Sequence, residues 1–286
     1  MPIISSGKLV KDAAARRTAV LAFNVVTLEQ AEAVVEAAQI TKSPVIVQVS
    51  HNALRFHGGQ MGSIAAAVRV LAQDSTVDIG LQLDHVEELS LIPLAAQNGF
   101  SSVMYDAARF SFDENVRLTK QACVIAHECG LWIEAEIGYV GGKPNAPASA
   151  HEHGVRTDPT EAADYVLATG VNALAVAVGS SHAMTTRTAQ LDRGLIGRIA
   201  EKSGVPLVLH GASGVDPEQL RGAISAGITK INVGTALNQA FTNKVRESLS
   251  DPGVADPRIY LTAGKRAITE HVAGLVGDVL NLPAGI

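Results

Sequence analysis

The stretch DIGLQLDH, residues 78 to 85, has the composition of a buried strand and ends on an acid and an imidazole. Leu81 and Leu83 suit an apolar interior, whereas Asp84 and His85 would be costly there unless they were paired or bound to something. Such a pair is tolerable at the open end of a strand, where chemistry is usually done. The stretch therefore predicts a strand of the core and a site at its end.

Apolar runs of this kind recur along the chain, and each is followed by a helical pattern. Several are almost continuously apolar at their centre, as expected for parallel strands covered on both faces. Eight alternations of strand and helix in about 220 residues favour a closed (β/α)8 TIM barrel. An open doubly wound sheet is the alternative, because periodicity does not prove closure. The runs are AVLAFNV (19 to 25), PVIVQVS (44 to 50), DIGLQLDH (78 to 85), SSVMYDA (101 to 107), WIEAEIG (132 to 138), ALAVAVGS (173 to 180), PLVLHG (206 to 211) and KINVGTA (230 to 236).

Capping signals mark where helices between these runs begin and end. Thr27 with Gln30 forms a capping box, and Ser111 with Glu114 forms another, with Gly130 as a stop signal. Two further segments carry a capping Asp, a Pro in the first turn and a Gly at the exit. They are Asp158-Pro159 with Gly170, and Asp216-Pro217 with Gly227.

The chain contains no low-complexity tract or linker, which predicts a single domain over residues 1 to 286. The irregular stretch 138 to 158 is rich in Gly, Pro and Ala, and a loop of that length inside a compact domain is usually a lid or binding loop. Residues 262 to 281 are predicted to form an additional C-terminal helix outside the eight repeats. This helix could pack on the barrel or on a second subunit.

Composition narrows the class of protein. The chain has 286 residues, 47% of them apolar, which suffices for a large core. Its net charge of −5 gives no electrostatic footprint for nucleic acid or an anionic membrane, so neither is expected as a partner. No signal peptide and no apolar run of about 18 residues is seen, so a cytoplasmic protein is expected. Cys123 and Cys129 fall in one predicted helix and are expected to be reduced thiols.

If the barrel closes, the polar residues that end its strands share one face. A lone His at a strand end is more often a structural residue than a ligand. Three at the same end favour a metal, because imidazole suits Zn²⁺ and three protein ligands with one open position describe catalytic zinc. His85, His182 and His210 are therefore the predicted zinc ligands. The strand-end residues are Asn24, Ser50, Asp84, His85, Asp106, Glu134, Glu136, Ser180, Ser181, His182, His210, Gly211 and Asn232.

Two further groups acquire expected roles from their positions. Asp84, beside a proposed ligand, could shuttle the proton of a substrate hydroxyl, or it could merely accept a hydrogen bond from a histidine. The turns HGASG (210 to 214) and NVGT (232 to 235) follow the last two strands, where barrels often bind phosphate through backbone N–H groups. Together these features predict a phosphorylated substrate held over a metal. The predicted phosphate cradle comprises Gly211, Ser213, Gly234 and Thr235.

These residues resemble the class II, metal-dependent ketose-bisphosphate aldolases, the group that contains fructose- and tagatose-bisphosphate aldolases. The resemblance runs over almost the whole chain and implies a (β/α)8 barrel. It is carried by AFN (22 to 24), SPVI (43 to 46), LDH (83 to 85), the acid at 106, EAEIG (134 to 138), TDP (157 to 159), LAVAVGSSH (174 to 182), PLVLHGASG (206 to 214) and KINVGT (230 to 235).

The resemblance implies a reversible cleavage of a ketose phosphate, with zinc stabilising the enediolate of the dihydroxyacetone phosphate half. It makes His85, His182 and His210 the ligands of one Zn²⁺ per subunit and Asp84 the acid/base. Asp106 and Glu136 match acids near the metal that offer an alternative metal position. A monovalent cation near the phosphate site and a homodimer or homotetramer are further expectations. The expected substrate- and phosphate-binding set is Asn24, Ser50, Gly179, Gly211, Ser213, Asn232, Gly234 and Thr235.

Departures from the family pattern affect the substrate-facing loops. The family's lid has two glycines before an acidic stretch whose glutamate moves the carbon-bound proton, whereas here Pro144 stands in its place. Ala183 follows the second metal histidine in place of the usual Gly. We therefore expect an atypical substrate, a modified or less phosphorylated ketose, with Glu152 or a lid histidine as the replacement base. The alternatives are a metal-dependent sugar-phosphate epimerase or isomerase, and a non-catalytic binding homologue.

Overall fold

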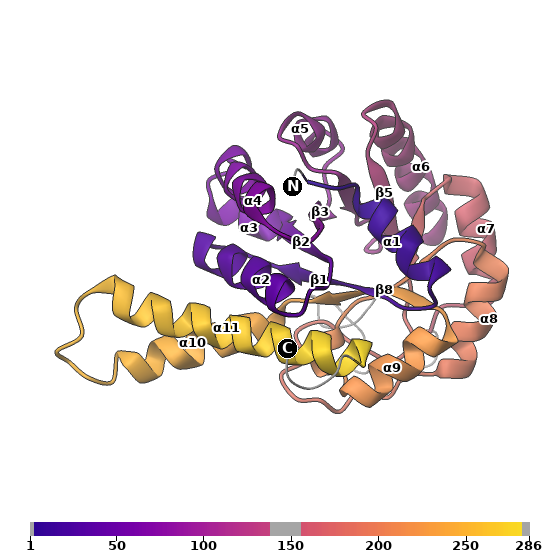
Figure 1. Cartoon of the computed structure of the whole chain (residues 1–286). Coiled ribbons are helices and arrows are strands. Elements are labelled where there is room, and N and C mark those ends of the chain that lie inside the picture. Colours follow the sequence, from indigo (N-terminus) through magenta and orange to yellow (C-terminus); the bar gives the residue numbers. More distant parts are fainter. Residues whose placement is uncertain (1–2, 138–155, 282–286) are drawn as a thin grey trace.

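Eight parallel strands close into a barrel in sequence order, with β1 paired to β8 (Figure 1). The computed structural model describes residues 3–137 and 156–281. Closure confirms the (β/α)8 barrel and excludes the open sheet. The strands are β1 Val20–Asn24, β2 Val45–Ser50, β3 Ile79–Val86, β4 Ser102–Tyr105, β5 Trp132–Glu136, β6 Ala173–Ala175, β7 Leu207–Leu209 and β8 Ile228–Val233.

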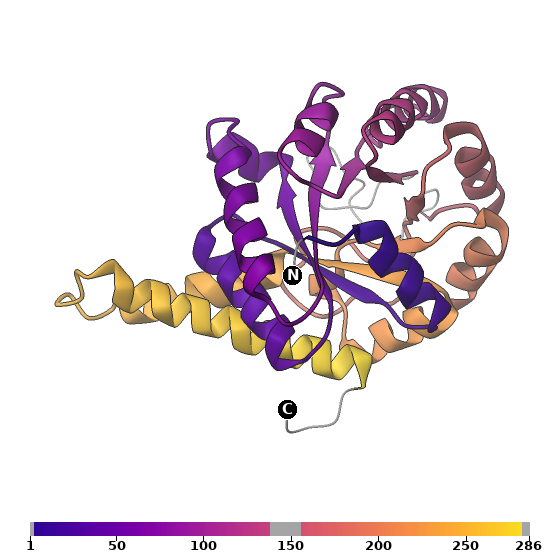
Figure 2. The same ribbon diagram turned by 45° about the horizontal axis from the view of Figure 1, so that its top comes forward.

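Helices surround the barrel, and their buried faces pack against outward-facing strand residues such as Leu21 and Phe23 (Figures 1 and 2). This is the arrangement that covers both faces of a parallel sheet. The helices are α1 Ser6–Ala15, α2 Leu28–Ile40, α3 His51–Phe56, α4 Gly62–Asp74, α5 Leu91–Gln97, α6 Phe112–Glu128, α7 Pro159–Thr169, α8 Arg193–Ser203, α9 Pro217–Ala226, α10 Thr235–Ser248 and α11 Pro257–Leu280, with a 3-10 turn at Ala212–Gly214.

The predicted caps are present at the helix ends. Thr27 accepts a hydrogen bond from the Gln30 backbone N–H, and the Gln30 side chain bonds back, which completes the capping box of α2. Asp158 caps α7 through the N–H groups of Thr160 and Glu161. Gly170 ends α7 in the left-handed conformation that favours glycine. These local signals therefore set the boundaries that the sequence indicated.

Helix α1, which precedes the first strand, was not predicted from the sequence. Its buried face lies against the amino ends of the strands, and it crosses that end of the barrel in Figure 2. Leu9 and Val10 join an apolar cluster with inward-facing Ile46 and Trp132. Gly7 permits this contact, because a Cβ there would collide with the Trp132 ring. The barrel is thus closed at its lower end by a helix.

Three elements differ in their boundaries from the sequence expectation. β6 ends at Ala175, although its apolar run continues to residue 180. β8 begins at Ile228 and ends at Val233, because Gly227 ends α9 with a positive φ and Thr235 already belongs to α10. The C-terminal helix begins earlier than predicted, since Asp256 caps it and Pro257 occupies its first turn.

Helices α10 and α11 pack against each other and project from the side of the barrel (Figures 1 and 2). α11 also packs on α2, where Lys265 Nζ lies 2.9 Å from Glu32 Oε2. The predicted C-terminal helix therefore covers part of the barrel wall and forms one arm of a hairpin. No helix within 3–137 and 156–281 is both long and apolar enough to cross a membrane.

Candidate metal centre and substrate cavity

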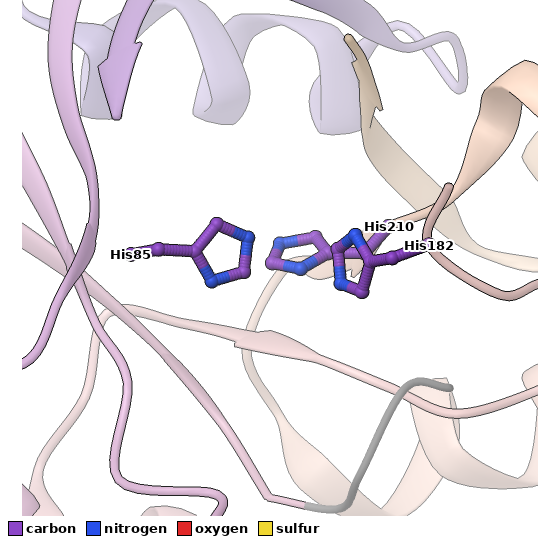
Figure 3. A group of neighbouring side chains, drawn as sticks. All are labelled: His85, His182 and His210. Carbon is purple, nitrogen blue, oxygen red and sulfur yellow. The ribbon is translucent and has the colours of Figure 1, made fainter. Parts of the chain in front are cut away.

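Three histidines from distant parts of the chain meet above the barrel interior (Figure 3). His85 belongs to β3, His182 follows β6 and His210 follows β7. Their ring centroids are 5.1 to 5.4 Å apart. One ligand nitrogen from each ring lies within 4.8 Å of the others, a grouping that could hold a metal ion. The structure therefore brings together the predicted triad.

Backbone geometry at His85 explains how two consecutive residues reach one site. Alternation along a strand would send Asp84 and His85 to opposite faces. His85 instead has a φ of 51°, in the left-handed region, and the pairing of β3 with β4 shifts register between Leu83 and Val86. Its ring consequently lies with Asp84 at the mouth of the barrel, where its Nε2 is 3.8 Å from Asp84 Oδ2.

Carboxylates orient two of the three rings. Asp106 Oδ2 lies 2.8 Å from His85 Nδ1, and Glu134 Oε1 lies 2.9 Å from His210 Nε2. A carboxylate on one ring nitrogen is the usual support of a metal-binding histidine, since it directs the other nitrogen to the ion. Asp106, predicted as part of an alternative metal position, thus lies where it supports His85.

Orphaned nitrogens test whether a divalent cation fits this site. His182 Nε2 and His210 Nδ1 are buried, and neither forms a well-aligned hydrogen bond among the described residues, although Glu136 Oε2 lies 3.8 Å and 3.0 Å from them. Buried polar atoms without partners are rare and need an explanation. Three imidazoles with nitrogens turned to a common point match the donor set of zinc. His85, His182 and His210 therefore fit a bound divalent metal.

Glu136 lies next to the same point. Its Oε2 is 3.0 Å from His210 Nδ1 and 3.8 Å from His182 Nε2, and its side chain is fully buried. A carboxylate beside these two ring nitrogens can accept a hydrogen bond from a protonated imidazole, or it can bind a cation that moves toward it. This geometry is compatible with the predicted alternative metal position.

Burial and neighbouring charges shift the pKa values of His182, His210 and Glu134 in different directions. Burial lowers the pKa of His182 to about 4, because it disfavours the charged ring. Burial also opposes protonation of His210, but the carboxylates of Glu134 and Glu136 outweigh it and raise its pKa to about 9. Burial likewise disfavours the charged Glu134, yet the Lys230 ammonium and His210 lower its pKa to about 2. A metal at His210 Nδ1 would therefore compete with a proton that Glu134 and Glu136 favour on this ring.

Asp84 is 1% exposed and is held by two amide donors. Asn24 Nδ2 donates to its Oδ2 at 2.8 Å, and Gln48 Nε2 donates to its Oδ1 at 3.3 Å. Hydrogen bonds to both oxygens fix the orientation of the carboxylate. Asp84 can therefore exchange a proton with a ligand hydroxyl at the metal site.

A cavity of about 290 Å³ opens above the histidines. Most predicted site residues line it, whereas His210, Asp106, Glu136 and Gly179 do not. Gly179 has a φ of 126°, and a Cβ there would collide with the Gln190 carbonyl. Close packing and backbone conformation therefore explain why this position is a glycine. Glu152 lies outside the described residues. The predicted residues that line the cavity are Asn24, Ser50, Asp84, His85, His182, Gly211, Ser213, Asn232, Gly234 and Thr235.

One end of the cavity has the features of an anion cradle. Gly234 precedes α10 and provides no side-chain cap. In the first turn of that 14-residue helix, Ala236 N donates to Ser213 Oγ and Leu237 N donates to the Gly234 carbonyl, which leaves the Thr235 N–H for a ligand. Gly211, at a φ of 71°, lies so close to the Ser181 carbonyl that any side chain would clash. No Lys or Arg among the described residues lines the cavity. Backbone groups would have to bind a phosphate here.

Sequence reasoning named Glu134 but missed Lys230 and Gln82, which form a polar layer with it below the site. Lys230, inside β8, donates to Glu134 Oε2 at 2.7 Å, and Gln82 Nε2 lies 3.4 Å from the same oxygen. These side chains point inward because they alternate with outward-facing residues such as Ile133 and Ile231. Period-two alternation through WIEAE and ITKINV was the signal that could have found them.

Comparisons with known proteins agree with this geometry. The family model for class-II fructose-bisphosphate aldolase matches residues 4–281. A fructose-bisphosphate aldolase of Geobacillus stearothermophilus is 39% identical over 277 residues, covering 96% of each chain. The crystal structure of the YdjI aldolase of Escherichia coli K12 is 32% identical with a TM-score of 0.81, covering 97% of each chain. Fructose-bisphosphate aldolase of Campylobacter jejuni, 24% identical with a TM-score of 0.82 over 98% of this chain and 96% of its own, shares the fold.

Proposed function

Because this chain belongs to the class II fructose-bisphosphate aldolase family, we propose that it is a zinc-dependent aldolase that reversibly cleaves a ketose phosphate. The products would be dihydroxyacetone phosphate and an aldehyde. The observation that carries the proposal is the convergence of three histidines beside Asp84, with one ligand nitrogen of each ring within 4.8 Å of the others. When bound, the metal would supply Lewis-acid polarisation of the substrate carbonyl.

Asp84 takes the proton in the cleavage direction. The hydroxyl on the fourth carbon of the ketose gives its proton to Asp84, and the O–H electron pair forms the new aldehyde carbonyl. The bond between the third and fourth carbons breaks, and its electrons move toward the carbonyl at the second carbon. A proton then returns to the third carbon, which completes dihydroxyacetone phosphate. Asn24 and Gln48 keep the Asp84 carboxylate in place through their amide donors.

Two other groups complete the proposed roles. Gly211, Ser213, Gly234 and Thr235 would hold the phosphate of the dihydroxyacetone end through backbone N–H groups and hydroxyls. Glu152 would move the carbon-bound proton in place of the missing lid glutamate, and it lies outside the described residues.

The substrate is proposed to be a modified or less phosphorylated ketose. Pro144 replaces the family's lid glutamate, and Ala183 replaces a glycine after the second metal histidine. The absence of Lys and Arg from the described cavity lining supports the same proposal, since a second phosphate would meet no cationic side chain there.

The deciding experiment is a screen of ketose monophosphates and bisphosphates for triose phosphate release. We expect one or more to release dihydroxyacetone phosphate with added Zn²⁺ and none to do so with a chelator. An epimerase or isomerase would convert substrate without releasing triose. Ligand binding without zinc-dependent turnover of any ketose phosphate would contradict an active aldolase.

We also propose that the protein assembles as a homodimer or homotetramer. The α10–α11 hairpin projects from the barrel, and Leu249 and Ile259 near its tip are about half exposed. A second copy would cover such apolar groups. Sedimentation equilibrium is expected to give a mass of at least twice that of one chain, and a monomer at micromolar concentration would contradict this.

A further inference from the structure

A fully buried lysine lies beneath the proposed metal site. Lys230 projects from β8 into the barrel, and its ammonium lies 2.7 Å from Glu134 Oε2 on β5. These strands are not neighbours in the barrel, so the ion pair crosses the interior. Both side chains are 0% exposed. Burying an ion pair usually gives little net stability relative to apolar residues of similar volume, which makes a positioning role the hypothesis to test.

The first connection runs from Lys230 to the metal ligands. Glu134 divides its oxygens, with Oε2 on Lys230 and Oε1 on His210 Nε2 at 2.9 Å. The lysine therefore fixes where the carboxylate can sit, and the carboxylate fixes the rotation of the imidazole ring. With Nε2 held in this way, His210 can offer only Nδ1 to a metal.

The second connection runs from Lys230 to the cavity wall. Its ammonium donates to Asn232 Oδ1 at 2.8 Å. An ammonium has only donors, so the Asn232 atom that faces it must be the carbonyl oxygen. Asn232 lines the cavity, and its buried Nδ2 has no hydrogen-bond partner among the described residues. The group that Asn232 can offer to a ligand is therefore a donor.

We propose that Lys230 is a positioning residue that simultaneously sets the orientation of His210, through Glu134, and the donor polarity of Asn232 toward a substrate oxygen. The inference about Asn232 rests on the proposed function, because it assigns the unpartnered amide to an oxygen of dihydroxyacetone phosphate. The inference about His210 does not, because it concerns metal affinity alone.

The main test removes both charges together. Lys230→Met alone would strand a buried carboxylate, whereas Lys230→Met with Glu134→Gln leaves a neutral pair. The matched control is Lys265→Met with Glu32→Gln, which neutralises an ion pair between α11 and α2 whose side chains are about one third exposed. Thermal unfolding and circular dichroism verify that each variant is folded. Lys230→Arg, which keeps the charge but changes the donor geometry, serves as a second variant.

Metal affinity is measured with Co²⁺ by chelator competition and by the visible absorption spectrum of the bound ion, without any turnover. The neutral pair is expected to weaken Co²⁺ binding about 10- to 100-fold and to shift its bands, as loss of a supporting carboxylate does. Lys230→Arg should weaken it less, and the control should match wild type. A folded neutral-pair variant and a folded Lys230→Arg with wild-type affinity and spectrum would overturn the inference.

Asn232 is tested by binding of dihydroxyacetone phosphate to the zinc-loaded protein, measured by calorimetry. Asn232→Ala is expected to weaken binding about tenfold in the wild-type background and about twofold or less in the neutral-pair background. Equal losses in both backgrounds would overturn the coupling. Failure of wild type to bind dihydroxyacetone phosphate would count against the proposed function, while the Co²⁺ measurement would still decide the role of Lys230.

Discussion

The lower and upper halves of the barrel interior have opposite chemistry, although the same strands build both. β5 contributes Trp132 to the apolar cluster that α1 closes, then Glu134 to the buried ion pair, then Glu136 to the histidine site. Successive inward positions thus pass from packing to positioning to reaction. The comparison teaches that stability is concentrated at the amino ends of the strands and chemistry at their carboxyl ends.

Removing a proposed ligand from the upper half should have the largest effect. His182→Ala would leave two imidazoles, too few to hold zinc against dialysis. We expect metal content near zero by elemental analysis and aldol cleavage at background, with the barrel still folded. Zinc content equal to wild type would mean that His182 is not a ligand.

Asp84→Asn tests the acid/base separately from the metal. The amide cannot accept the hydroxyl proton, so kcat is expected to fall about 10²- to 10⁴-fold, the range typical of general acid/base groups. Bound zinc should stay at the wild-type level. Loss of zinc together with activity would place Asp84 among the ligands instead.

Trp132→Ala is the corresponding change in the lower half. It would open a cavity against α1 and reduce the free energy of unfolding by about 3 to 5 kcal/mol, measured by denaturant titration. The Co²⁺ affinity of the folded fraction should remain within about twofold of wild type, since the apolar cluster that Trp132 joins contains none of the site residues. A large loss of affinity would show that the two halves are coupled.

The smallest expected effect is the release of a proton from His210 when zinc binds in the upper half. The pKa of His210 is raised to about 9, so at pH 7.5 the metal-free protein carries a proton that zinc must displace, whereas His182, with a pKa near 4, is already neutral. Calorimetry in buffers of different ionisation enthalpy should detect release of about one proton per zinc. Because the pKa of His210 is raised on folding, its protonation stabilises the metal-free folded protein. This contribution to the free energy of unfolding is fully present below pH 6.5 and is lost as the pH rises to 9. No proton release at pH 7.5 would contradict this assignment.

Sequence patterns predicted the parts of the molecule that depend on local chemistry. Apolar runs identified all eight strands, and capping residues such as Thr27 and Asp158 identified helix starts. The triad was accessible because closure of a parallel barrel brings all carboxyl ends to one face. Helix α1 was missed, since nothing in SGKLVKDAAA shows that it would close the barrel.

The polar layer was harder to predict because it depends on contacts across the barrel. A lysine in KINV is usually an exposed residue, and only the position of Glu134 across the interior explains its burial. The left-handed backbone at His85 was likewise inaccessible, because a non-glycine residue rarely adopts it without tertiary support.

That backbone conformation has a consequence for redesign. Since the proton acceptor and the first imidazole are consecutive in sequence, one peptide unit sets the distance between them, and neither can be moved alone. Engineers who want other aldehydes accepted should leave this dipeptide untouched and vary the neutral rim, where Val25 and Asn52 border the opening. The choice of aldehyde could then be changed without altering the residues that carry out the reaction.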